Sequence, residues 1–537
     1  VGWWILAALT ALAGLAVLAQ ALARQALAED DDFPVLTTLG LRPRDLAALG
    51  LLRAAVVAVA GAAAGVAVAV ALSPIAPLGE ARLADPGPGP RADGLVLGLG
   101  AVATVGLVLA IGAVVAGRQA WPRADRDVVS RPSVVVRAAV AAGAPASTVI
   151  GLRHALTRTS GTRALPVATA LTGAVAAVAA LAATAVFGAS LTHLTRSPEL
   201  YGAPFQRYVT SSGPGGAPAS LLAELHRDPA ISQVTTITLP PVTVNQVGVR
   251  AITTTAVRGP TLLSAVRGRL PRGPGEVALG VSTLRRTGSH LGSPVTVTVT
   301  DPDGARRSAR FRVVGLVAFP GDLATGGLGT GVALTTAGYL GAACPPGPEQ
   351  AACRRSVQRS EQSAVLIRAV PGARGAVTLT RLDRQYQGDT YRPQVPEALV
   401  NFGESANFPL MLGAVLVLCG IAALAYLLIA SVARRRAESA LLKALGFVRR
   451  QTAAVVFWQA SAVAVIGVII GLPLGAAVGQ AIWRVFAFDL GMVAVPVVPG
   501  WDLVALAAGV LVAANALAVV PAVAAARSRT GLVRRTE

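Results

Sequence analysis

Side chains that could carry out catalysis are few and scattered in this 537-residue chain. The four histidines are His154, His193, His226 and His290. They show none of the spacings by which histidines ligate a metal, and neither Ser211 nor Ser212 lies in a G-x-S-x-G motif. The only lysine, Lys443, does not stand in a phosphate-binding G-x-x-x-x-G-K-[ST] loop. The sequence therefore predicts no enzyme, no metal site and no nucleotide site in this chain.

Two of the three cysteines are spaced so that they could bond to each other. Cys344 and Cys353 bracket residues 345–352 in a region that we expect outside the cytosol, so we predict a local disulfide, with two free thiols as the alternative. A metal site is not expected there because no histidine lies nearby. Cys419 lies within an apolar run and is interpreted as a packing residue.

The segment 431–451 is rich in basic residues, and it lies between two long apolar runs. Its apolar residues recur at helical spacing, which predicts a short basic amphipathic helix able to dock on a partner protein. The alternative is a solvated loop. The predicted contact residues are Arg434, Arg435, Arg436, Glu438, Leu441, Leu442, Lys443, Leu445, Gly446, Arg449 and Arg450.

The composition is that of a membrane protein: 53% of the residues are hydrophobic, and the mean hydropathy is +0.61. The net charge of +20 comes from arginines placed in the loops between apolar blocks, with no basic face interleaved with aromatic residues. This distribution argues against nucleic-acid binding and favours the positive-inside rule of membrane proteins.

Seven apolar segments are long enough to cross a bilayer as helices. They are Trp3–Leu22, Leu52–Leu72, Leu95–Ala116, Leu165–Phe187, Phe408–Ser431, Ala453–Ile482 and Leu503–Val523. None has an ionisable residue in its central part, which argues against an ion-coupled carrier or a channel.

Arginine-rich segments predict the orientation in the plasma membrane. Residues 117–164, 431–451 and 527–537 are expected in the cytosol, which places the start of the chain outside and the C-terminus inside. The acidic run 29–32 disagrees with this topology. No cleavable signal peptide is evident, and Val1 indicates a fragment or an alternative start.

The first three spans resemble the last three at a constant offset of 406 positions, because Leu39-Gly40 and Arg44 match Leu445-Gly446 and Arg450. This register predicts a duplication. Each copy also has a G-x-x-x-G pattern, which we interpret as packing between the two halves, with a glycine-rich composition as the alternative. The predicted packing glycines are Gly61, Gly65, Gly467, Gly471 and Gly475.

Residues 189–407 differ in character and predict a soluble α+β domain on the outer side. Alternating runs predict strands at Val234–Leu239, Val242–Val247, Val295–Thr300 and Phe311–Val317. Ser220–Arg227 reads as a short helix.

The motif Arg434-Arg-Arg-Ala-Glu438, followed by Leu441-Leu-Lys-Ala-Leu-Gly446 and Arg449-Arg-Gln451, resembles the cytosolic signature of FtsX-like/MacB-type ABC transporter permeases. Pro274-Gly-Glu-Val-Ala-Leu-Gly280 and Phe311-Arg-Val-Val-Gly315 are similar to the outer domain of the same family. The resemblance implies a separate ATP-binding cassette ATPase, as a dimer, that carries ATP and Mg²⁺ and docks on the coupling helix matched by residues 438–446.

The first copy departs from the family pattern, since acidic residues replace the basic triplet. It implies a degenerate second coupling site formed by Leu39, Gly40, Arg42 and Arg44. This copy also lacks the preceding helix and outer domain, which either lie upstream of Val1 or belong to another subunit.

We therefore expect a mainly α-helical polytopic membrane protein of about seven spans with one extracytoplasmic α+β domain of the MacB periplasmic type. The expected divisions are a three-helix copy (1–131), a cytosolic elbow (132–163), a span (164–188), the outer domain (189–407), the second three-helix copy (408–526) and a tail (527–537). The resemblance implies mechanotransmission that exports or extracts an amphipathic cargo such as a lipid, lipoprotein, peptide or drug. The alternative is a signalling module that regulates a cell-wall hydrolase or senses an antibiotic without transport. The expected partners are the ATPase, the lipid bilayer and an extracytoplasmic protein or lipoprotein.

Overall fold

The computed structural model describes residues 42–75, 92–120, 133–156, 167–211, 218–300, 305–321, 323, 327–344, 346–397, 399–400 and 446–527. The described residues divide into two compact units. The first, the helical unit, comprises the described residues up to 186 together with 446–479 and 498–527. The second, the α+β unit, comprises those from 187 to 400 together with 480–497.

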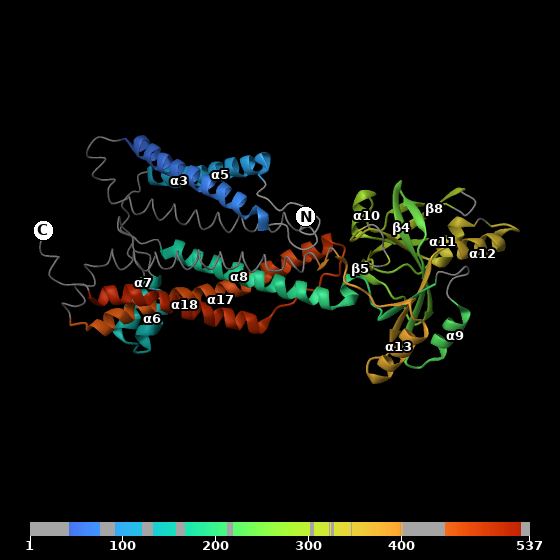
Figure 1. Cartoon of the computed structure of the whole chain (residues 1–537). Helices are drawn as coiled ribbons and strands as arrows, with labels where there is room; N and C mark the ends of the chain where they lie inside the picture. Colours follow the sequence, from blue (N-terminus) through green and yellow to red (C-terminus); the bar gives the residue numbers. More distant parts are fainter. Residues whose placement is uncertain are drawn as a thin grey trace. The chain divides into compact units, whose positions relative to one another are not determined.

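The helical unit is built from long apolar helices (Figure 1). They are α3 (Pro43–Leu72), α5 (Gly94–Ala120), α6 (Val134–Ala141), α7 (Ala146–Leu156), the first part of α8 (Val167–Arg196), most of α17 (Arg449–Asp489) and α18 (Gly500–Arg527), with the 3-10 turn η1 (Ser73–Ile75). The described parts of α3, α5, α8, α17 and α18 are long and apolar enough to cross a membrane, which confirms five of the predicted spans as helices. The predicted spans 3–22 and 408–431 lie outside the described residues.

Helix starts and breaks follow local sequence signals. α3 begins with Pro43 in its first turn, where the Asp45 carboxylate accepts a hydrogen bond from the Arg42 N–H at 3.0 Å. Ser133 caps α6 by accepting from the Val136 N–H at 3.3 Å. Gly143, with φ +69°, and Pro145 separate α6 from α7, so the predicted elbow is two short helices.

The α+β unit contains one sheet of eleven strands. They are β1 (Arg207–Ser211), β2 (Ile231–Thr238), β3 (Pro241–Val244), β4 (Val247–Arg258), β5 (Ser264–Gly268), β6 (Glu276–Leu279), β7 (Pro294–Thr300), β8 (Arg306–Ala318), β9 (Val332–Thr335), β10 (Ser363–Ala369) and β11 (Thr390–Tyr391). Its order is β11-β1-β10-β2-β4-β3-β7-β8-β6-β9, and β5 pairs with β8. β4 also pairs in parallel with β9, so the six strands β4, β3, β7, β8, β6 and β9 form a closed barrel.

The predicted strand Val242–Val247 is wrong in its second half. The chain turns back at Asn245 and Gln246, which have φ values of +42° and +70°, and this two-residue turn joins β3 to β4. Positive φ at both central residues suits the right-handed twist of a hairpin. The other predicted strands lie on β2, β7 and β8.

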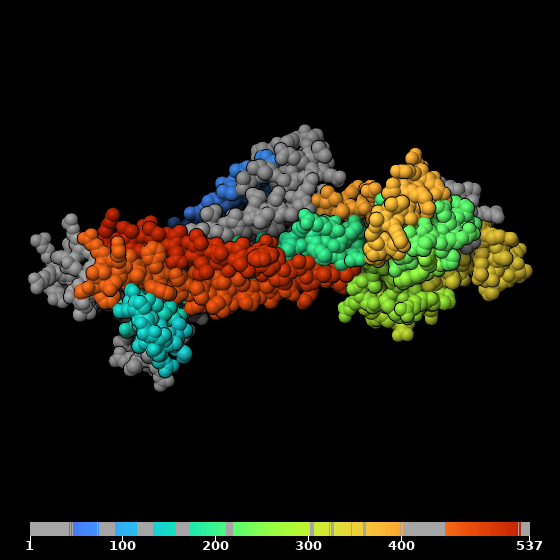
Figure 2. Space-filling view, turned by 90° about the horizontal axis from the view of Figure 1, so that it is seen from below, coloured from blue at the N-terminus to red at the C-terminus, as the bar shows by residue number. Residues whose placement is uncertain are grey.

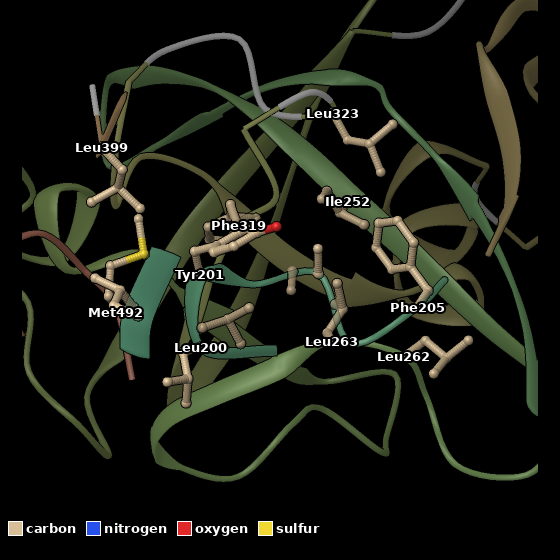
Figure 3. Close-up of a cluster of buried hydrophobic side chains, with 14 of the residues drawn as sticks. Leu200, Tyr201, Phe205, Ile252, Leu262, Leu263, Phe319, Leu323, Leu399 and Met492 are labelled. Atoms are coloured by element: carbon tan, nitrogen blue, oxygen red, sulfur yellow. The ribbon is translucent and has the colours of Figure 1, made fainter. Parts of the chain in front are cut away.

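Short helices complete the α+β unit. They are η2 (Pro198–Tyr201), α9 (Ala219–Arg227), α10 (Val281–Arg286), α11 (Thr336–Ala343), α12 (Gln350–Ser360) and α13 (Ala373–Gln385). α9 and α13 pack on β2 and β10 through a core that includes Leu221, Leu225 and Leu382. The barrel interior is filled by valines and leucines of its strands, with Tyr339 and Cys344 of the α11 region. A third core gathers Leu200, Tyr201, Phe205 and Phe319 with Met492 (Figure 3).

The Pro274-Gly275-Glu276 motif forms a tight turn before β6. The Glu276 carboxylate accepts hydrogen bonds from Arg269 Nη1 at 2.7 Å and from the backbone N–H groups of Arg272 and Gly273 at 2.9 and 3.2 Å. The Arg269 hydrogen bond, followed by the backbone donors, lowers the pKa of Glu276 to about 2. The carboxylate therefore stays ionised while it holds the turn together.

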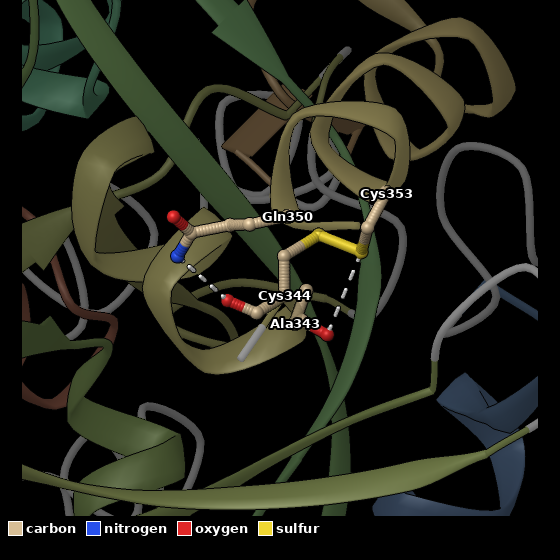
Figure 4. The surroundings of a disulfide bond; sticks show 4 residues. All are labelled: Ala343, Cys344, Gln350 and Cys353. Atoms are coloured by element: carbon tan, nitrogen blue, oxygen red, sulfur yellow. Dashed lines mark hydrogen bonds between the residues drawn. A yellow bond between two sulfur atoms is a disulfide. The ribbon is translucent and has the colours of Figure 1, made fainter. Parts of the chain in front are cut away.

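Cys344 and Cys353 are joined by a disulfide that links the end of α11 to α12 (Figure 4). The S–S distance is 1.97 Å, and Cys344 is fully buried. The Gln350 side chain donates to the Cys344 carbonyl oxygen at 3.3 Å, which tightens the same loop.

Replacing both cysteines with alanine is expected to lower the free energy of unfolding of the α+β unit by about 3 kcal/mol, because the short closed loop loses its constraint on the unfolded chain. Thermal unfolding of the purified chain with and without reductant measures this. Reductant should lower the wild-type midpoint to that of the double variant, and Cys419→Ala serves as the control. An unchanged midpoint in the double variant would contradict the stabilising role.

Candidate coupling site

The predicted coupling residues lie mostly outside the described residues. Arg434, Arg435, Arg436, Glu438, Leu441, Leu442, Lys443 and Leu445 belong to that undescribed part, as do Leu39 and Gly40 of the degenerate site. Gly446 is described, with φ +97°, and stands directly before α17. Arg449 and Arg450 are exposed in the first turn of α17, where the Val448 N–H donates to Gln451 Oε1 at 3.0 Å.

Arg42 and Arg44 lie at the start of α3, as Arg449 and Arg450 lie at the start of α17, and both are exposed. α3 begins at Pro43 and α17 at Arg449, while α5 begins at Gly94 and α18 at Gly500, so both pairs start 406 positions apart. The helix starts thus follow the offset found in the sequence. In both copies a pair of arginines lies at the N-terminal turn of a long apolar helix.

The glycines of the second copy pack against α8. A Cβ added at Gly471 would come within 2.8 Å of Val178 Cβ, one at Gly475 within 2.2 Å of the Ala179 carbonyl oxygen, and one at Gly479 within 2.8 Å of the Ala183 oxygen. Gly467 meets Ala174 at the looser distance of 3.4 Å. The two helix backbones approach closely because both present small residues at spacings of four.

Among the described residues, the second-copy glycines contact the neighbouring α8, and packing between the two halves stays a prediction. A Cβ at Gly61 or Gly65 would meet no atom of the described residues within 4 Å. α3 packs instead on α5 through Ala54, which lies opposite Gly112. The motif marks a flat helix face but does not identify the helix that covers it.

A second close contact fixes the first turns of α17. In Figure 2, α7 (cyan) lies against the first part of α17 (orange). A Cβ at Gly151 of α7 would stand 2.6 Å from Trp458 Cβ and 2.7 Å from the Val455 carbonyl oxygen. Ala155 of α7 and Val463 of α17 are buried in the same contact. The apolar character of the elbow was the available sequence signal for this helix pair.

Residues 410–529, which include α17 and α18, match the family described as FtsX-like permease C-terminal. This part of the chain is similar to the C-terminal domain of FtsX-like permeases, and we call it the FtsX-like domain. A search of curated proteins finds no match to the chain. The match to this family and the five described helices that are long and apolar enough to cross a membrane fit a membrane protein of the permease type.

Within the FtsX-like domain, α17 and α18 are joined by a polar contact between apolar faces. Ser461 Oγ donates to Asn515 Oδ1 at 3.0 Å, and the Asn515 amide donates to the Leu511 carbonyl oxygen at 2.9 Å. Ala460, Ala518 and Ala522 are buried around this pair. The described part of the domain is thus a packed helix pair with α8 and α7 on α17.

The described residues outside the FtsX-like domain bring no catalytic group together. They contain no cluster of three or more His, Cys, Asp or Glu side chains placed to hold a metal ion. His193 Nδ1 lies 3.5 Å from Ser197 Oγ one helical turn away, which is a local contact at the end of α8.

Sequence reasoning missed that residues 480–497 belong to the α+β unit. The predicted span ends at Ile482, but α17 continues to Asp489 and places Trp483, Phe486 and Ala487 in the core shared with Phe187 and Leu200. The aromatic residues that follow the apolar run were the available signal.

Proposed function

We propose that the chain is the membrane subunit of an ABC transporter whose nucleotide-binding subunits are separate proteins. ATP and Mg²⁺ would be bound by that partner, as a dimer, and this chain would convert the partner's closure into motion of its α+β unit by mechanotransmission. The observation that carries the proposal is α17, a single helix of the FtsX-like domain. It begins at the basic coupling segment and ends within the α+β unit.

The proposed topology places the basic segment 431–451 and the tail in the cytosol and the α+β unit outside, in the manner of the MacB-type outer domain. Two observations support it. The arginine-rich segments follow the positive-inside rule. The Cys344–Cys353 disulfide lies in the α+β unit, and disulfides persist in oxidising compartments.

The proposed cargo is an amphipathic molecule, such as a lipid, lipoprotein, peptide or drug, taken up from the outer leaflet or the outer surface. α3, α5 and α18 expose large apolar side chains along their lengths, and α5 and α18 carry no Asp, Glu, Lys or Arg in their central parts. An ion-conducting path would need polar groups inside the membrane. We therefore assign the handling of the cargo to the outer surface of the chain.

The double variant Glu438→Arg with Leu441→Asp is expected to abolish stimulation of the co-purified ATPase. Reversing one charge and removing one apolar anchor from a coupling helix should weaken the contact by more than about tenfold, since interface anchors cost about 2 kcal/mol each. ATP turnover of the reconstituted complex and recovery of the ATPase on affinity-tagged chain measure the effect. Circular dichroism and the thermal midpoint verify folding.

The matched control is Arg44→Glu at the degenerate site, which should change ATP turnover less. Unchanged turnover and unchanged co-purification in the double variant would contradict the coupling assignment. ATP-dependent movement of a labelled lipid or peptide by the wild-type complex separates transport from signalling, because a signalling module would hydrolyse ATP without moving either.

A further inference from the structure

α17 is a longer helix than α3, which is its counterpart in the first copy. The two helices start at equivalent positions, but α3 has 30 residues and α17 has 41. At the offset of 406, Leu72 at the end of α3 corresponds to Val478, so residues 479–489 have no helical counterpart in α3. The α+β unit takes in the chain from Gln480 to Val497, which includes all of these residues except Gly479. The additional residues at the end of α17 are therefore the part of the helix that belongs to the α+β unit.

The end of α17 is fastened to α10. An Asp489 carboxylate oxygen forms an ion pair with Arg285, whose guanidinium also donates to the Asp489 carbonyl oxygen at 3.3 Å. The Asp489 side chain is only 17% exposed. The helix then terminates at Gly491, with φ +75°, and the Met492 N–H donates to the Ala487 carbonyl oxygen at 2.9 Å.

The backbone at Gly491 touches the loop before β9. A Cβ at Gly491 would lie 2.7 Å from Gly329 Cα, so Gly491 leaves no room for a side chain, and a Cβ at Gly329 would stand 3.3 Å from the Leu490 carbonyl oxygen. Gly329 is in turn tied to α10, because its carbonyl oxygen accepts from the Ser282 N–H at 2.9 Å. Gly331, two residues on, donates to Thr283 Oγ1 at 2.9 Å and leads directly into β9.

Two further contacts hold the chain after the turn. The Val493 N–H donates to the Leu200 carbonyl oxygen at 3.0 Å, and the Val497 N–H donates to Ser190 Oγ at 2.9 Å. Met492 is buried in the core drawn in Figure 3. Residues 480–497 are thus an integral part of the α+β fold, fixed on both sides of the turn.

The attachment acts at the seam of the barrel. β9 is the strand that closes the ring, since it pairs with β6 on one side and with β4 on the other. A displacement of the α17 end would reach β9 through Gly491 and Gly329 and would reach α10 through Asp489 and Arg285. Both routes consist of backbone contacts or a charge-assisted pair, which transmit displacement better than loosely packed side chains.

We infer that residues 480–497 form a latch through which α17 moves the barrel seam of the α+β unit, with Arg285, Asp489 and the Gly329–Gly491 contact as its positioning residues. This inference rests on the proposed function and adds a mechanical input besides the two chain segments that enter and leave the α+β unit.

The test uses the full chain in complex with its ATPase, with spin labels at two exposed positions of the α+β unit. Val377→Cys on α13 and Thr300→Cys on β7 report the distance between the open sheet and the barrel, in a Cys419→Ser background. In the otherwise native chain, addition of ATP is expected to shift this distance. Arg285→Glu should reduce the shift by about half or more, because like charges then face each other at the latch. Adding Asp489→Arg to this variant should restore the shift, since the ion pair is re-formed with reversed charges.

The matched control is Arg286→Glu, the next residue of α10, which is exposed and does not meet Asp489. ATP turnover and ATPase co-purification should stay at the wild-type level in all four chains, which separates the latch from the coupling helix.

An equal ATP-induced shift in wild type and Arg285→Glu, or no shift in wild type with normal ATP turnover, would overturn the latch while leaving the proposed function intact. Loss of ATPase binding by the wild-type chain would instead overturn the proposed function. If Arg285→Glu lowers the thermal midpoint, the milder Arg285→Ala gives the same comparison.

Discussion

Replacing Gly475 with leucine is expected to force α17 away from α8 and to destabilise the helical unit by at least about 3 kcal/mol. Even the first added carbon would lie 2.2 Å from the Ala179 carbonyl oxygen and 2.7 Å from Ala182 Cβ. The oxygen belongs to a helix backbone and cannot rotate aside, so the helices must separate. The neighbouring contacts at Gly471 and Gly479 would then be lost with it.

Gly65→Leu is the matched control for this prediction, because it changes the equivalent motif in the first copy. An added Cβ there meets no atom of the described residues within 4 Å, and leucine is a better helix former than glycine. We expect the thermal midpoint of detergent-solubilised Gly65→Leu to equal or slightly exceed that of wild type, while Gly475→Leu falls well below it. Equal midpoints for the two variants would show that the α8–α17 contact does not contribute to stability.

The positions of the spans could be predicted from the sequence because hydropathy directly reports the solvent of a membrane helix. The ends of α8 and α17 could not. Hydropathy drops at Arg484 and Asp489, yet α17 continues because Trp483 and Phe486 pack on Phe187 of α8, with ring centroids 5.5 and 5.2 Å from that of Phe187. Tertiary contacts of this kind extend a helix beyond its apolar run, and the aromatic residues after that run were the one local signal.

The partner of a motif was harder to predict than the motif itself. The glycine spacing correctly indicated a close helix contact in the second copy, but both copies carry that spacing, and in the described part of the chain only the second-copy glycines face an alanine-rich neighbour. In the α+β unit, the alternation across Val242–Val247 concealed the turn at Asn245, since a hairpin preserves the period of two on both sides. Closure of the barrel by β4 and β9 joins strands about eighty residues apart, as in the pair Ala251–Val332, and no local pattern encodes such a pairing.

The candidate coupling site was predicted from charge and apolar spacing, and most of its residues lie outside the described part of the chain. What the structure adds is its place in the fold. Arg449 and Arg450 start α17, which continues into the α+β unit, whereas Arg44 lies at the start of α3, which ends at Leu72 within the helical unit. This asymmetry supports the proposal that the C-terminal site carries the stronger contact with the ATPase.

Replacing Trp483 with alanine is expected to cost about 3–5 kcal/mol and to lower the thermal midpoint of the α+β unit by about 10 °C. The side chain is fully buried, and its ring lies 5.5 Å from that of Phe187 and 5.8 Å from that of Phe486. Its indole N–H has no hydrogen-bond partner among the described residues.

Trp483→Phe keeps an aromatic ring in the core and removes this unpaired donor, whose burial costs about 1–3 kcal/mol, so its midpoint should stay near wild type. Trp501, at 86% exposure, supplies the control, and Trp501→Ala should leave the α+β transition unchanged. Equal losses in Trp483→Ala and Trp483→Phe would mean that the indole N–H is satisfied in solution, and that this end of α17 depends on a polar contact as well as on aromatic packing.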